Sequence, residues 1–166
     1  TPSGGTFSLW NESGEELSQF ASGALTLSGA NASLHIQNEQ GTPVAVVASD
    51  STGHGRFQIA DASGNVMSEM RMLPGVGGGI IVNSTAGKKM GVLAATDEGG
   101  RLNLMNARGV PIFVASTVDS TGGGAMIVTN QRGIPVVVVK SDEKHRGLIE
   151  IMDEDGNGVR SMRPIR

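Results

Sequence analysis

The chain has 166 residues, a mass of 17.1 kDa, no cysteine and a formal net charge of −3. This weak negative charge argues against nucleic acid or an anionic membrane as the main partner, because either one requires a clear basic excess. The lack of cysteine excludes disulfides, thiol catalysis and cysteine-ligated metals, and no apolar run approaches the about 20 residues of a membrane-spanning helix.

The dominant feature of the sequence is a tetrapeptide that begins with Asn, Asp or Ser and ends in glycine. Its first side chain can bond to the backbone two residues on, and its glycine tolerates a positive φ. From Gly41 onward the glycines lie 23, 23, 22, 24 and 23 residues apart. The pattern predicts about seven β-hairpin units of roughly 23 residues, each with a type I turn and a G1 bulge. The expected turns end at Gly14, Gly41, Gly64, Gly87, Gly109, Gly133 and Gly156.

The turn geometry also predicts a pairing register, in which the first turn residue faces the residue after the glycine. Ile36 then faces Val44 and Leu34 faces Val46, so apolar side chains meet across the hairpin. The exceptions are Phe57 with Glu69, Ile149 with Ser161 and Phe7 with Gln19. The predicted core or interface stripe is Leu34, Ile36, Val44, Val46, Ile80, Val82, Leu102, Leu104, Ile112, Val114, Val128, Val136, Val138 and Ile151.

The segments between hairpins are expected to form a second series of glycine-rich turns. They cover residues 50–53, 97–100, 119–122 and a degenerate version from 142 to 147. After Asp50 the same rule places Val47, and not Val46, beside Phe57. Residues 15–20 are expected to be strand or loop, and residues 73–79 to kink the array without dividing it into domains.

The expected fold is therefore all-β, an elongated meander in one domain over residues 1–166 with a basic tail at 160–166. One face of such a meander is apolar and must be buried. A trimeric triangular β-prism and a single-chain β-solenoid can both bury it, and the hairpin signal favours the antiparallel trimer. A membrane barrel is disfavoured because the expected strands are shorter than the 9–11 residues that span a bilayer.

The repeat at residues 123–138, GGAMIVTNQRGIPVVV, resembles the glycine-turn β-repeats of bacterial surface proteins and the trimeric shafts of phage tail fibres and spikes. This resemblance covers most of the chain as a pattern. It implies a rigid, non-catalytic, trimeric stem and identifies no functional residues.

Candidate chemistry is sparse. The glycine runs at 75–79 and 122–124 lack the following helix and lysine of a phosphate loop. Stacked turn aspartates, namely Asp50, Asp97, Asp119 and Asp142, could bind a hard cation, although turn chemistry alone explains them. An inward-facing His35 could form a three-histidine site on a trimer axis, with a solvent-facing strand position as the alternative. We expect no catalytic, cofactor or metal-binding residues.

These observations predict a non-enzymatic structural or assembly module, a homotrimeric shaft of an extracellular, cell-surface or virion fibre, stalk or large complex. The alternative is an adhesin-like module whose exposed turn rows bind glycans or a protein, and a polysaccharide depolymerase ranks third. Besides the homo-oligomer, another protein could bind the basic C-terminal end.

Overall fold

The computed structural model describes residues 7–10, 12–14, 16–21, 24–29, 31–117, 123–141, 144 and 146–162. Within these residues the chain contains fifteen β-strands and no helix, which confirms the all-β prediction. Within each of its two sheets, every strand pairs antiparallel with its neighbours in sequence order, so the topology is a meander that does not close on itself.

The meander divides into two sheets. A three-stranded sheet contains β1 (Phe7–Trp10), β2 (Glu16–Ala21) and β3 (Ala24–Leu27). The first predicted unit therefore forms a sheet of its own, and residues 16–21 are strand, within the strand-or-loop expectation.

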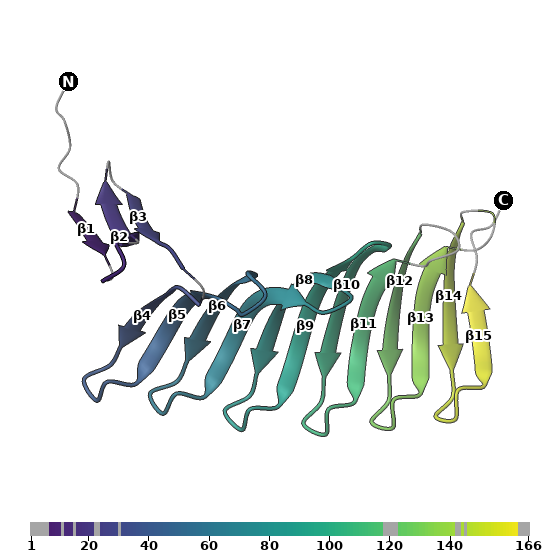
Figure 1. Ribbon diagram of the computed structural model, residues 1–166. Coiled ribbons are helices and arrows are strands. Elements are labelled where there is room, and N and C mark those ends of the chain that lie inside the picture. The colour runs from purple at the N-terminus through teal and green to yellow at the C-terminus, as the bar shows by residue number, and fades with distance from the viewer. Residues whose placement is uncertain are drawn as a thin grey trace.

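The second sheet has twelve strands and carries the other six hairpins (Figure 1). Its strands are five to eight residues long. They are β4 (Ser33–Gln37), β5 (Pro43–Ser49), β6 (Gly55–Ala60), β7 (Val66–Leu73), β8 (Gly77–Asn83), β9 (Lys89–Thr96), β10 (Gly99–Met105), β11 (Pro111–Thr117), β12 (Gly124–Thr129), β13 (Pro135–Ser141), β14 (Gly147–Met152) and β15 (Gly158–Met162).

The predicted hairpin turns are present. In the hairpin of β4 and β5, the Gly41 N–H donates to the Asn38 carbonyl at 3.0 Å, and the Asn38 N–H donates to the Thr42 carbonyl at 3.0 Å. The Asn38 side-chain oxygen also accepts the Gln40 and Thr42 N–H groups. All seven predicted turn glycines have φ between 73° and 86°, which favours glycine over any residue with a Cβ. The six turns from Gly41 to Gly156 lie along one edge of the large sheet, here called the hairpin-turn edge (Figure 1).

The predicted register is wrong by one residue beyond the turn. Gln37 pairs with Pro43 as expected, but the register then shifts, and Ile36 pairs with Ala45 instead of Val44. Each hairpin has this second bulge at the same place, which leaves one residue of the second strand without a partner. In the large sheet these unpaired residues are Val44, Met67, Met90, Ile112, Val136 and Val159.

The shift removes the three exceptions in the predicted pairing. Phe57 pairs with Met70, Ile149 with Met162 and Phe7 with Phe20. The expectation that Val47 lies beside Phe57 is confirmed.

The segment at 73–79 does not interrupt the sheet. Strands β7 and β8 continue the meander through a tight turn, in which the Val76 N–H donates to the Leu73 carbonyl at 3.0 Å. The turn predicted at 97–100 is shorter than expected, because Thr96 already pairs with Gly99 across Asp97 and Glu98.

Candidate interaction surface

Two rows of apolar side chains cross the whole large sheet on one of its faces, here called the apolar face. In the row farther from the hairpin turns, each residue is the direct cross-strand partner of the next. This distal row is Leu34, Val47, Phe57, Met70, Ile80, Leu93, Leu102, Ala115, Met126, Val139, Ile149 and Met162. Not one of its twelve positions is polar.

The row nearer the hairpin turns, the proximal row, lies two residues away on each strand and points to the same face. It is Ile36, Ala45, Ile59, Ser68, Val82, Gly91, Leu104, Phe113, Val128, Val137, Ile151 and Arg160. Only Ser68 and Arg160 carry a polar side chain, so the apolar band is two residues wide and twelve strands long.

No part of the described chain covers this face. Ile36 is 60% exposed, Val47 52% and Leu93 49%, although each sits among apolar neighbours. A shallow hollow lies on the face around the small side chain of Ala115, between Leu102 and Met126. A contiguous exposed apolar surface of this extent is unusual for a monomeric protein and is typical of interaction sites.

On the opposite face, here called the polar face, charged side chains shield the apolar ones. The five buried apolar side chains among the described residues lie there, and each pairs directly with a long charged side chain on the neighbouring strand. The pairs are Ala48 with Arg56, Ile81 with Glu69, Ala94 with Arg101, Val138 with Glu150 and Leu148 with Lys140. The stems of such side chains shield apolar neighbours while their charged ends stay in water.

Polar contacts tie these charged side chains together. Lys140 Nζ lies 3.2 Å from Glu150 Oε2, so this ion pair runs diagonally beside Val138 and Leu148. Glu69 accepts bonds from Gln58 Nε2 and Arg71 Nε, both at 2.8 Å. The polar face therefore suits water, and the apolar face is the one whose apolar side chains stay exposed.

The structure separates the predicted stripe into two faces. Leu34, Ile36, Ile80, Val82, Leu102, Leu104, Val128 and Ile151 lie on the apolar face, whereas Val46, Val114 and Val138 lie on the polar face. Val44, Ile112 and Val136 are the unpaired bulge residues. Several members of the two rows are absent from the predicted stripe, among them Val47, Leu93, Phe113, Val137 and Val139. The mismatch of Phe57 with Glu69 was the signal that could have revealed them.

Neighbouring turns are bonded to one another along the hairpin-turn edge. Asn38 Nδ2 donates to the Ala62 carbonyl at 3.1 Å, and Asn130 Nδ2 donates to the Glu154 carbonyl at 2.8 Å. Arg132 Nη2 also lies 2.9 Å from Asp155 Oδ1. These contacts join the turns of neighbouring hairpins, which lie side by side in the sheet.

The turn aspartates are explained by hydrogen bonding within their own turns. Asp50 Oδ1 accepts bonds from Thr52 Oγ1 at 2.6 Å and from the His54 N–H at 3.0 Å. These bonds, the Thr52 hydroxyl first, lower the pKa of Asp50 from its ordinary value of 3.8. The pKa of Asp61 and that of Asp153 are lowered in the same way. The donors are the side chain and the backbone of Asn65 for Asp61, and of Asn157 for Asp153.

Among the described residues, no three His, Asp or Glu side chains are close enough together to hold a metal ion. Asp119 and Asp142 lie outside the described residues. His35 pairs with Val46 on the polar face, away from Leu34 and Ile36. No described helix has the length and apolar character needed to cross a membrane.

The comparisons with known proteins add no family to this description. No protein-family model matches the sequence, and the search of curated proteins gives no significant match.

Proposed function

We propose that this chain is a non-enzymatic structural module and forms one third of a homotrimeric β-prism shaft. The observation that carries the proposal is the uncovered apolar face, which runs without interruption over all twelve strands of the large sheet. A face of this kind requires a partner surface of the same length and chemistry. A second and a third copy of the chain provide one.

The energy available from covering this face is large. Fully burying an aliphatic side chain contributes about 1.5–3 kcal/mol, so each half-exposed member of the two rows leaves roughly 1 kcal/mol unrealised. Over the whole face this amounts to on the order of 10 kcal/mol per chain. Association costs about 4–15 kcal/mol in lost freedom, so a trimer that buries three such faces is favourable.

Strand length favours three chains around a common axis. Strands of five to eight residues are about 17–27 Å long at about 3.4 Å per residue. A triangle with sides of about 20 Å places each sheet about 6 Å from the axis, close to half of the about 10 Å between packed sheets. Two rows of side chains per strand fill that space, and His35 then faces outward.

Twelve strands spaced about 4.8 Å apart would give a rod about 50 Å long. A rigid rod with a polar outer surface suits a stalk, a fibre or an accessory subunit of a large extracellular, cell-surface or virion assembly. The self-covered polar face supports this placement of the sheet, with charged side chains outside and apolar side chains inside.

Sedimentation equilibrium tests the proposal directly. The expected mass is three times the 17.1 kDa of the chain at micromolar concentration. Leu104→Asp, on the apolar face, should give monomers, whereas Asn103→Asp, the neighbouring residue on the polar face, should leave the trimer intact. A wild-type monomer, or equal effects of the two variants, would refute the proposal.

A further inference from the structure

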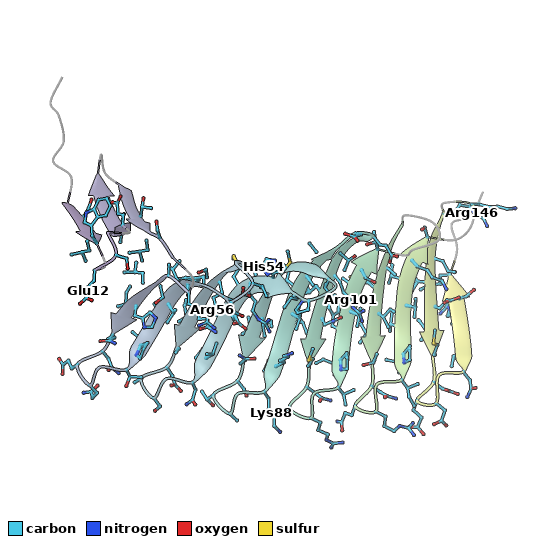
Figure 2. All side chains as sticks on the ribbon, viewed as in Figure 1. Glu12, His54, Arg56, Lys88, Arg101 and Arg146 are labelled. Atoms are coloured by element: carbon cyan, nitrogen blue, oxygen red, sulfur yellow. The ribbon has the colours of Figure 1, made fainter. Side chains whose placement is uncertain are left out.

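The strand β9 carries opposite charges at its two ends. Lys88 and Lys89 stand where β9 begins, at the hairpin-turn edge, and Asp97 and Glu98 follow its last residue at the other edge. All four residues are exposed. Figure 2 shows Lys88 at the hairpin-turn edge, where its Nζ donates to the Ala107 carbonyl of the next turn at 3.2 Å.

Lys89 and Asp97 do not neutralise each other within one chain. The eight residues of β9 separate Lys89 from Asp97 by about 25 Å, well beyond the screening length of about 8 Å in physiological salt. Neither Lys89 nor Asp97 belongs to an ion pair within the described residues. Arg108, in the next turn along the same edge, extends the basic stretch.

The strand β5 provides a contrast in the same sheet. Both of its ends are acidic, with Glu39 in the turn before it and Asp50 after it. Asp50, moreover, is already bonded to Thr52 and His54. Opposite charge at the two edges is therefore a property of the middle of the sheet and not of every strand.

The next inference rests on the proposed homotrimer. We propose that the three chains are parallel and in register, and that their β9 strands follow one another head to tail around the axis. Asp97 and Glu98 of each chain then lie against Lys88 and Lys89 of the next at each corner of the prism. This follows from symmetry, because a rotation about the long axis of the sheet keeps every strand at its own level. It also brings the hairpin-turn edge of one chain to the opposite edge of its neighbour.

An antiparallel arrangement does not give this complementarity. A two-fold axis along the strands places the hairpin-turn edge of one chain against the same edge of its partner, and the lysines then face no carboxylates at their own level. Complementary charges mainly set the orientation and register of an interface, while the apolar face supplies most of the free energy.

Cysteine cross-linking tests the corner, and the natural chain has no cysteine to interfere. Lys89→Cys combined with Asp97→Cys should give covalently closed trimers on a non-reducing gel after mild oxidation. Each single variant, as its control, should stay uncross-linked within the trimer. If the protein is a trimer by sedimentation but gives no cross-link, the proposed contact at the corner is wrong and the proposed shaft still stands. Monomers in wild type would instead refute the shaft itself.

Charge reversal provides a second test that does not depend on disulfide geometry. Lys88→Glu with Lys89→Glu should raise the trimer dissociation constant about 100-fold over three corners, and Asp97→Lys with Glu98→Lys should do the same. All four changes together should restore it to within a few-fold. The matched control, Arg56→Glu with Arg101→Glu, makes the same change in net charge on the polar face. It should leave the trimer dissociation constant unchanged. Weakening without rescue, or an equal effect of the control, would contradict the proposed pairing.

Discussion

Leu93 and Leu148 allow one substitution to be compared on the two faces of the same sheet. Leu93 lies in the distal row of the apolar face and is 49% exposed, whereas Leu148 lies on the polar face and is 5% exposed. A buried Leu→Ala change costs about 2.7–5 kcal/mol. For Leu93 about half of that burial exists in the single chain, and the other half is expected to form only on assembly.

Leu93→Ala should therefore weaken the trimer by about 1.4 kcal/mol per subunit, or about 4 kcal/mol in total. This corresponds to a rise of about a thousandfold in the trimer dissociation constant. Leu148→Ala should lower the free energy of unfolding of the chain by about 3 kcal/mol and leave the dissociation constant unchanged. Sedimentation equilibrium measures the first quantity and urea denaturation at fixed concentration measures the second. An unchanged dissociation constant for Leu93→Ala, or an equal rise for Leu148→Ala, would show that the apolar face is not the interface.

Three further predictions address the turns and the exposed methionines. Gly156→Ala should lower the free energy of unfolding by about 1–2 kcal/mol, because the φ of Gly156 is +85° and an added Cβ would lie 3.0 Å from Ile134 Cγ2. Gly158 lies in the same hairpin with open space around its Cα, so Gly158→Ala should leave the stability nearly unchanged. Thermal denaturation compares the two variants. The hydrogen bonds that lower the pKa of Asp153 stabilise the fold above its ordinary value of 3.8, and this contribution disappears as pH falls through the lower folded value. Asp153→Asn should therefore flatten the loss of stability below about pH 4 in acid titration followed by circular dichroism, and an unchanged curve would contradict the assignment. Met126, 44% exposed in the single chain, should resist peroxide in the trimer and oxidise in a monomeric variant, as read by mass spectrometry; equal rates in both would place it outside the interface.

Local chemistry made the repeat predictable. An Asn, Asp or Ser followed three residues later by glycine forms the same turn in all six hairpins of the large sheet, because its hydrogen bonds lie within five residues, as at Asn38–Thr42. Glycine at the last position then adopts the positive φ that other residues avoid. Turn positions, strand order and the all-β class all follow from that local signal.

The register was not predictable by the same means. The turn fixes only the first pairs. The bulge next to it inserts one residue, and a proline precedes that residue in only three of the six hairpins of the large sheet, at Pro43, Pro111 and Pro135. Because side chains alternate between the faces, a slip of one residue moved Val46, Val114 and Val138 to the wrong face in the prediction. The predicted pairing of apolar Phe57 with charged Glu69 was a sign in the sequence that the predicted register was wrong.

The amino-acid sequence by itself determined the hairpin units and the need to bury apolar side chains, since both depend on short-range patterns. Only the tertiary structure decided which of these side chains share a face, because that depends on a bulge set by pairing between strands. It also decided which face is left exposed in the single chain. The polar face is covered by charged side chains from neighbouring strands, as Lys140 covers Leu148, and that relation exists only once the strands are aligned.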